Sequence, residues 1–514
     1  MSHLIILPVV LPALVAPFIL MAIRHHLDLQ RIFSVAGTLA LVGVAFILAG
    51  QAADGDIQVY ELGDWRAPFG IVLVLDRLSA LMVLLTSLLA LAIVLYAIGT
   101  GWDKRGHHFH ALFQFQLMGV AGAFLTGDAF NLFVFFEVLL IASYGLMIHG
   151  GGAERLRAGV QYVVFNLLGS TLFLFALGTI YAVTGTLNMA DLAERVSSLS
   201  TEDTALIRVG AILLLLVFSI KAAVLPLHFW LPGSYANAPA PVAAFFAIMT
   251  KVGAYAILRM YTLVFGPDEP VSKGLVGDWL LPASLLTLAI GMIGVFGARD
   301  IAKLVAFAAI GSMGTLMIAI SIFTPVSAGA AVYYIMHSTL ATAMMFLIAD
   351  LVIERRGRAL QPSLRMPQSG LISAVFFAGA VAMAGMPPLS GFLGKIAVLQ
   401  ASYGVPEQAL IWAVILVTSL VAIMGFARAG GIIFWKTLDP QEPDDVSDTD
   451  LHTDLTEAKS PIVALPFVAC FGLLAGLVAL TIFAGPALQY SEATAAQLFD
   501  PSSYIDAVLG GAEK

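Results

Sequence analysis

The chain is divided into runs of about twenty apolar residues, separated by short polar segments. A helix of that length crosses a hydrocarbon layer about 30 Å thick. Apolar and polar positions do not alternate within the runs, which disfavours a transmembrane β-barrel. The pattern predicts an all-α polytopic membrane protein with about fourteen transmembrane helices, near residues 4–23, 32–50, 73–98, 110–127, 129–149, 159–184, 206–227, 241–264, 277–297, 302–323, 328–351, 370–401, 408–434 and 461–485.

The segments between these runs hold most of the polar residues. Residues 51–70 contain aromatic residues and several acids, which is typical of a short hairpin at the membrane surface. Residues 185–205 are polar and acidic. Residues 435–460 carry eight acidic residues, from Asp439 to Glu457, and are predicted to form an acidic cytoplasmic loop.

The composition excludes several classes of protein. Of the 514 residues, 60% are hydrophobic and 11% are charged, whereas about 25% are charged in an average soluble domain. So few charges exclude a soluble enzyme, a nucleic-acid-binding protein and a disordered chain. The one cysteine, Cys470, lies in an apolar run, and the chain has no Walker loop, dinucleotide fingerprint, haem motif or iron–sulfur spacing. We therefore expect no cofactor, no metal centre and no enzymatic reaction from this chain alone.

The distribution of positive charge predicts the orientation in the membrane. Loops after odd-numbered runs carry fifteen of the 25 Lys and Arg residues, whereas loops after even-numbered runs and the tail carry seven. Because cytoplasmic loops are enriched in Lys and Arg, the first set of loops is predicted to be cytoplasmic. Both termini then lie outside the cell.

Three lysines lie inside apolar runs and not in loops: Lys221, Lys251 and Lys395. Glu137 is the acid that lies clearly in the middle of a run. A charge at the centre of a bilayer costs about 2.5–3.5 kcal/mol on insertion scales. Such groups persist where they pair, contact water or carry protons, so we interpret them as a proton path. A buried ion pair that only fixes the register of the helices is the alternative.

Two histidines and two groups of prolines extend this set. His337 lies inside a run, and His228 stands in a proline-rich segment after Lys221. Each histidine taken alone is equally well explained as a structural residue. Proline interrupts helical hydrogen bonding, so we predict breaks in the seventh helix, near Pro226, and in the twelfth, at residues 387–388.

The two breaks suggest an internal repeat. Lysine precedes the prolines in the seventh helix and follows them in the twelfth, and five helices separate the two, so they cross the membrane in opposite senses. We therefore predict two inverted five-helix repeats, helices 4–8 and 9–13. The chain is then divided into N-terminal helices 1–3 with the hairpin (1–109), a first repeat (110–264), a second repeat (265–434), the acidic loop (435–460) and a last helix with an amphipathic tail (461–514).

These residues resemble the antiporter-like subunit family, which is shared by Mrp-type multisubunit cation/proton antiporters, respiratory complex I and membrane-bound hydrogenases. The resemblance covers nearly the whole chain, most firmly 110–430, and is greatest to the D-type subunits of Mrp antiporters. One departure is Ser312, where complex I relatives often have a histidine. The motifs that carry the resemblance are Gly127-Asp128 leading to Phe136-Glu137, Lys221-x4-Pro-x-His-x-Trp-Leu-Pro, Thr250-Lys251-Val252-Gly253, and Gly385-Met386-Pro387-Pro388 leading to Gly394-Lys395.

The resemblance implies a role for each buried group. Glu137 would pair with Lys221, Lys251 would be the central relay, and His337 would connect it to Lys395 near the exit. His228 would serve access from the cytoplasm. Together these side chains would form a water-filled lateral row near the middle of the membrane.

The resemblance also implies an environment and partners. The chain would belong to a prokaryotic plasma membrane complex with Mrp subunits A, B, C, E, F and G, with protons and Na⁺ as substrates. The residues leave open whether this subunit itself carries Na⁺. A proton-pumping subunit of a complex I-like quinone oxidoreductase or a membrane-bound hydrogenase is the alternative function. A scaffold without transport is disfavoured by the three buried lysines.

Overall fold

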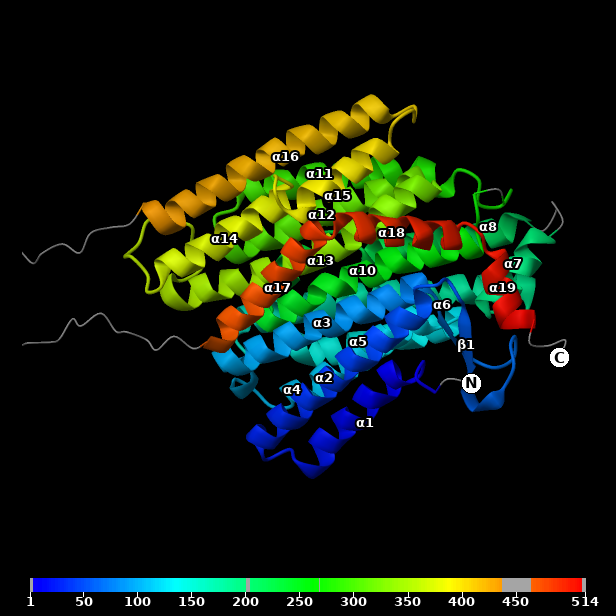
Figure 1. The fold of residues 1–514 in the computed structure, drawn as a ribbon, viewed down its shortest axis with the longest axis horizontal. Helices are drawn as coiled ribbons and strands as arrows, with labels where there is room; N and C mark the ends of the chain where they lie inside the picture. The colour runs from blue at the N-terminus through cyan, green and yellow to red at the C-terminus, as the bar shows by residue number, and fades with distance from the viewer. Residues whose placement is uncertain (1–2, 200–203, 268, 437–463, 511–514) are drawn as a thin grey trace, which may run out of the picture.

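The apolar runs of the sequence become the helices of one bundle in a computed structural model, which describes residues 3–199, 204–267, 269–436 and 464–510 (Figure 1). Every predicted run contains a helix, and the all-α membrane fold is confirmed. Among the described residues, eleven helices are long and apolar enough to cross a membrane, and three shorter apolar helices lie at Leu7–Ala22, Phe109–Leu125 and Ser369–Ala384. The count of fourteen crossings stays a prediction.

The first part of the bundle is built from helices that are consecutive in the chain. The helix α1 packs on α2 and α4, α2 on α3, and α4 on α5. Their bounds are α1 (Leu7–Ala22), α2 (Leu27–Ala52), α3 (Arg77–Thr100), α4 (Phe109–Leu125), α5 (Ala129–Met147) and α6 (Ala153–Thr184), with the short helix η2 (Trp102–Lys104) before α4 and α7 (Met189–Ser197) after α6.

The second part contains the two broken helices. The seventh predicted run forms α8 (Thr204–Lys221), which ends five residues before Pro226, and the short helix α9 (Trp230–Asn237) follows just beyond the run; the twelfth run forms α14 (Ser369–Ala384) and α15 (Ser390–Ala401). Both predicted breaks are therefore confirmed. The remaining helices are α10 (Ala240–Leu263), η3 (Leu275–Leu280), α11 (Leu281–Gly297), α12 (Ile301–Ile322), α13 (Pro325–Arg356), α16 (Gln408–Gly430), η4 (Gly431–Trp435) and α17 (Ala464–Ile482).

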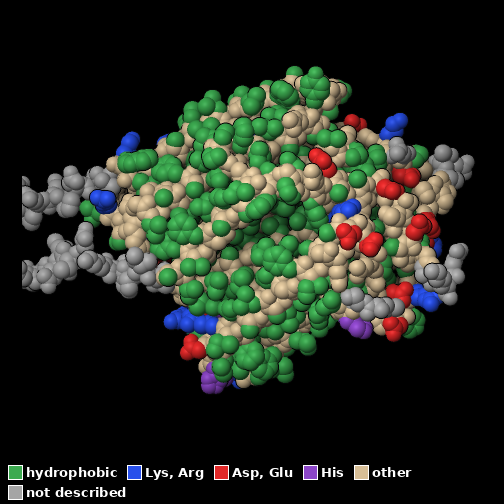
Figure 2. Space-filling model, viewed as in Figure 1, with side chains coloured by type: hydrophobic (Ala, Val, Ile, Leu, Met, Phe, Trp, Pro, Cys, Tyr) green, Lys and Arg blue, Asp and Glu red, His purple; other side chains and the backbone are tan. Residues whose placement is uncertain are grey.

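Two helices form the centre of the bundle. The most apolar windows of α10 and α13 are completely buried by the rest of the chain, and the two helices pack on each other. The predicted repeats have matching neighbours, since α4 packs on α5 as α11 packs on α12. The inverted symmetry itself stays a prediction. Figure 2 shows hydrophobic side chains over the flank of the bundle and charged side chains mainly toward its two ends, as expected for a chain surrounded by lipid.

The hairpin is longer than the sequence predicted. The strands β1 (Gln58–Glu61) and β2 (Val72–Leu75) pair in an antiparallel sheet, so β2 occupies residues that were expected at the start of the third helix. That helix begins only at Arg77, because Asp76 caps it: the Asp76 carboxylate accepts a hydrogen bond from the Ser79 backbone N–H at 2.8 Å.

The tail, which the sequence predicted only as amphipathic, forms two helices that pack back onto the bundle. The helix α18 (Ala484–Leu498) lies against α13, and α19 (Ser502–Leu509) lies against α7 (Figure 1). The start of α1 and the helix α19 lie toward the same end of the bundle (Figure 1). The predicted acidic loop at 435–460 lies almost entirely in 437–463, outside the described residues.

Candidate functional site

Lys221 is the last residue of α8 and lies directly at the first helix break. Its side chain is buried, and its ammonium group donates hydrogen bonds to the backbone oxygen and the side-chain oxygen of Asn166 on α6, at 3.3 and 3.2 Å. Beside it is a cavity of about 10 Å³, lined by Lys221, Asn166 and Tyr235 among others. A cavity of this size is about the smallest that holds one water molecule. We call it the Lys221 cavity.

Glu137 lies half-buried on α5, close enough for its charge to act on Lys221. Within the described parts of the chain, however, no ion pair within 4.0 Å joins the two residues, and the Glu137 Oε1 atom has no hydrogen-bond partner. The predicted Glu137–Lys221 pair is therefore not a direct contact in this structure.

Lys251 and His337 occupy the two central helices, α10 and α13, and each side chain is 1% exposed. The ammonium group of Lys251 forms no hydrogen bond or ion pair with any other residue that the structure describes. The Nδ1 atom of His337 lies 3.0 Å from the Ser390 hydroxyl, at the start of α15. His337 is close enough to both Lys251 and Lys395 for their charges to act on it. The structure thus brings these three groups together.

Lys395 lies on α15, just after the second break. Its ammonium group donates hydrogen bonds to the Ala384 backbone oxygen and to the Ser419 hydroxyl, both at 2.8 Å. Ala384 is the last residue of α14, so the carbonyl that the break leaves without a helical partner is bonded by the lysine. Gly385 leaves room for this, since a Cβ there would lie 2.5 Å from the Lys395 side chain.

His228 lies in the first break, between α8 and α9, and is half-buried. Its Nδ1 atom is buried without a hydrogen-bond partner among the described residues. Among the described residues, no hydrogen bond joins it to Lys221, Lys251 or Lys395. Its assignment as an access group stays a prediction.

Sequence reasoning misplaced Arg259, which was counted among the loop residues. It lies inside α10 and is buried, and its guanidinium group donates two hydrogen bonds to the Asp76 carboxylate, at 2.6 and 2.9 Å. The correct signal was present, because Arg259 lies within the run 241–264. The partner was not visible, because it is 183 residues away in the chain.

We expect Arg259→Ala to destabilise the protein strongly. The substitution leaves the buried Asp76 carboxylate without its cation, which typically costs about 3–5 kcal/mol of the free energy of unfolding. Thermal melting of the purified protein in detergent measures the effect. Arg208→Ala, at an exposed position on α8, is the matched control and should melt near the wild-type temperature. Equal melting of the two variants would contradict a structural role for the Asp76–Arg259 pair.

A second buried carboxylate, that of Asp103, connects two of the N-terminal helices. Asp103 in η2 accepts two hydrogen bonds from Arg31 on α2, at 2.6 and 3.0 Å, and lies 3.2 Å from the His110 ring on α4. Burial alone would raise the pKa of Asp103, but His110 and Arg31 hold it below its usual value. The group therefore stays negative and keeps α2 and α4 together.

Sequence reasoning missed Asp350, which is near the end of α13. Its side chain is buried, and its Oδ2 atom accepts hydrogen bonds from the Tyr96 hydroxyl at 2.9 Å and from the Trp102 indole N–H at 2.8 Å. The position is close to the end of an apolar run, where an acid cannot be told from a residue of the adjoining loop. Its burial follows from the packing of α3, η2 and α13 around it.

Comparisons with known proteins place these residues in a family. Residues 126–422 match the family model described as "NADH:quinone oxidoreductase/Mrp antiporter, TM". The chain is 37% identical to the D-type subunit of a probable K⁺/H⁺ antiporter from Rhizobium meliloti, over 99% of this chain and 98% of that protein. It is 38% identical to the D-type subunit of the Na⁺/H⁺ antiporter from Bacillus subtilis, over 99% and 100%.

Two solved structures are also similar to this chain. A chain of the Mrp complex from Dietzia sp. DQ12-45-1b superposes with a TM-score of 0.87 at 30% identity, over 99% of this chain and 100% of that one. A chain of respiratory complex I from Thermus thermophilus superposes with a TM-score of 0.77 at 25% identity, over 96% and 99%.

Proposed function

This chain belongs to the NADH:quinone oxidoreductase/Mrp antiporter family and is a subunit of a cation/proton antiporter, and we propose that its buried basic groups carry the protons. It is a multi-pass plasma membrane protein and part of a multisubunit complex. The curated relatives are antiporter subunits, which favours this function over a pumping subunit of a redox complex.

One arrangement carries the proposal: Lys251 and His337 are buried on α10 and α13, which pack on each other, and His337 lies 3.0 Å from Ser390 on α15, the helix that carries the buried Lys395. Cations buried together are costly. If the three groups exchange protons, they are not all charged at once, and the cost of burying them together is lower. Lys221 and Lys395 extend the row to the two helix breaks, and Glu137 supplies the negative charge near Lys221.

We propose the following path of transfer within the subunit. A proton would pass from Lys221 beside Glu137, through Lys251 and His337, to Lys395, with water bridging the gaps between groups. The groups would lie near the middle of the membrane, with the odd-to-even loops in the cytoplasm and both termini outside. His228 would provide access from the cytoplasmic side of the first break.

The relatives support a proposal for the exchanged cation and the partners. Relatives are named for both Na⁺ and K⁺, so the exchanged ion is a monovalent cation, with Na⁺ as the first choice. The described residues contain no group of three or more His, Cys, Asp or Glu side chains that could hold a metal ion. We propose that the cation route involves other subunits of the Mrp type, named A, B, C, E, F and G.

Reconstitution tests this function. Proteoliposomes that contain the complete complex should acidify or alkalinise their interior when a Na⁺ gradient is applied, measured with a pH-sensitive dye, and K⁺ should be compared. Liposomes with this chain alone should show no cation-coupled proton flux. Strong flux from the chain alone would contradict the need for partners, and no flux from the complex with any monovalent cation would contradict the proposed function.

A further inference from the structure

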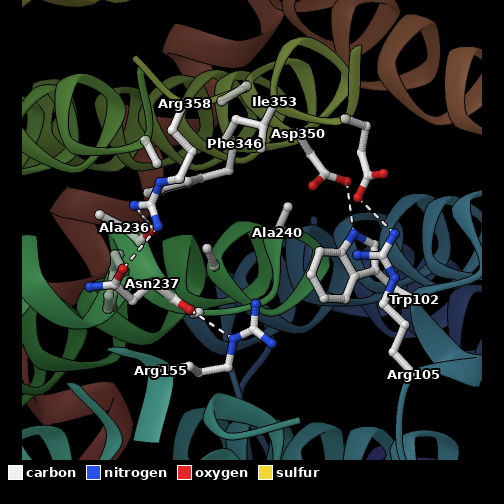
Figure 3. A pocket seen from close by; sticks show the side chains of 16 residues that line it. Trp102, Arg105, Arg155, Ala236, Asn237, Ala240, Phe346, Asp350, Ile353 and Arg358 are labelled. Atoms are coloured by element: carbon white, nitrogen blue, oxygen red, sulfur yellow. Dashed lines mark hydrogen bonds and ion pairs between the residues drawn. The ribbon is translucent and has the colours of Figure 1, made fainter. Parts of the chain in front are cut away.

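A polar pocket opens at the end of the bundle opposite to the chain termini. It has a volume of about 230 Å³ and lies between η2, α9 and the adjoining ends of α10, α12 and α13. Trp102, Arg105 and Asp350 lie on one side of it, and Arg155 and Arg358 lie on the other (Figure 3). We call it the Asp350 pocket.

The arginines of the pocket already have partners. Arg105 pairs with Glu354 at 2.7 Å, and Arg358 pairs with Asp300 at 3.0 Å. Arg155 donates hydrogen bonds to backbone oxygens, among them that of Asn237 at 2.9 Å. None of these three arginines forms an ion pair within 4.0 Å of Asp350.

Asp350 is the exception in the pocket. It is 3% exposed, and both of its hydrogen-bond donors, Tyr96 and Trp102, are neutral and bind the same oxygen, Oδ2. In the described chain no cation lies within 4.0 Å of its carboxylate. A buried carboxylate that is held only by neutral donors can accept and release a proton without breaking an ion pair.

A single side chain connects this pocket to the relay. Tyr235 on α9 lines the Asp350 pocket and also lines the Lys221 cavity, and no other residue lines both. Tyr235 is buried, and its hydroxyl donates a hydrogen bond to the Phe246 backbone oxygen at 3.0 Å. Its side chain thus borders both the pocket and the space beside Lys221, and we call it the shared wall. Tyr235 belongs to α9, the short helix that follows the first break.

We propose that the Asp350 pocket is the cytoplasmic mouth of a proton route to Lys221, with Asp350 as the proton acceptor at the mouth and Tyr235 as the barrier between the pocket and the Lys221 cavity. The inference rests on the proposed function. The ionised Asp350 takes a proton from water in the pocket and returns it to water on the inner side, when the Tyr235 ring moves aside. A hydrated Na⁺ ion is excluded from this route, because the shared wall leads to a cavity with room for about one water molecule.

Thiol labelling tests the route without measuring transport. Cys470 is the chain's one cysteine and is buried, so a Cys470→Ala background is used once its transport is shown to be normal. Ala243 lines the pocket, whereas Ala244, the next residue of α10, does not, and both are buried. In the complex in inverted vesicles, a membrane-impermeant methanethiosulfonate should react with A243C and not with A244C. Equal rates for the two, or reaction of A243C only in right-side-out vesicles, would overturn the assignment of the mouth.

The barrier is tested in the same vesicles. Leu139 lines the Lys221 cavity and not the pocket. L139C should be unreactive beside the native Tyr235, and should become reactive from the cytoplasmic side when Tyr235→Ala is added. Tyr235→Phe keeps the ring and should leave L139C protected. Reaction of L139C with the native tyrosine in place, or protection in the Tyr235→Ala variant, would overturn the role of Tyr235 as the barrier.

Asp350→Asn tests the proton acceptor. Asparagine keeps an oxygen for Tyr96 and Trp102 but cannot take up a proton. We expect proton transport by the complex to fall about tenfold or more, with Asp350→Glu restoring most of it. The deficit should grow as the pH on the cytoplasmic side is raised, where protons are scarce, and should not follow the outer pH. The other charged and titratable groups that act on Asp350 are Tyr96, Arg105, Arg155, Glu354 and Cys470, all unchanged in this variant.

The outcomes separate this inference from the proposed function. If Asp350→Asn transports at the wild-type rate with the wild-type pH profile while Lys395→Ala is inactive, Asp350 is not the proton acceptor and the proposed function stands. If Lys395→Ala and Glu137→Ala are both fully active, the proposed function fails, whatever the labelling of Ala243 shows.

Discussion

Lys395→Ala should abolish cation-driven proton transport while the complex still assembles. Lys395 is bonded to the Ala384 carbonyl at the second helix break and lies next to His337, so its removal interrupts the proposed row at its last group. The alanine leaves the Ala384 carbonyl without its hydrogen-bond donor, which costs about 1–3 kcal/mol, but it also removes a buried cation whose insertion is costly, so the complex should still assemble. Proton flux is measured with a pH-sensitive dye in proteoliposomes that contain the purified complex. The flux should fall to the level of liposomes without protein.

The control for this variant is Lys303→Ala, because Lys303 is an exposed lysine at the start of α12. It should transport at the wild-type rate. Normal flux from Lys395→Ala, with normal amounts of complex in the liposomes, would contradict a role for Lys395 in proton transfer.

Glu137→Ala should have an effect of similar size at the other end of the row. Its carboxylate acts on Lys221 from a distance beyond direct contact, and a buried cation is costly without a nearby negative charge. Removing the carboxylate therefore disturbs the charge state of Lys221 in every step. Antiport in inverted vesicles should be lost while the level of the protein in the membrane stays normal.

Two further variants make the Glu137 test sharper. Glu137→Asp keeps the charge and should retain part of the activity, whereas Glu154→Ala, at an exposed acid on α6, should be fully active. Undiminished exchange in Glu137→Ala vesicles would mean that Lys221 does not need this carboxylate.

The sequence predicted the helices well, because lipid imposes a simple requirement on them. Every spanning backbone must be hydrogen-bonded within its own helix, so run length alone located α2, α10 and α13. The two breaks followed equally directly from the prolines at 226 and 387–388. The hairpin was misjudged at residues 72–75, because a short apolar strand and the first turn of an apolar helix have the same composition.

The candidate site was only partly accessible to such reasoning. The four residues Glu137, Lys221, Lys251 and Lys395 were found because a charge in an apolar run is conspicuous. Their hydrogen-bond partners, such as Asn166 and Ser419, were not found, because a single amide or hydroxyl in a helix carries no signal of its own. Asp350 could not be recognised either, since its donor Tyr96 is 254 residues away.

The central claim is that the buried groups must take up and release protons, and Lys395→Arg tests it most directly. Arginine keeps a positive charge and hydrogen-bond donors for the Ala384 and Ser419 oxygens, but it stays protonated at any accessible pH. Proton flux is measured in proteoliposomes with the complete complex that carries this substitution. We predict flux well below that of the wild type, close to that of Lys395→Ala, and wild-type flux from Lys395→Arg would contradict the proton relay and leave Lys395 as a fixed charge.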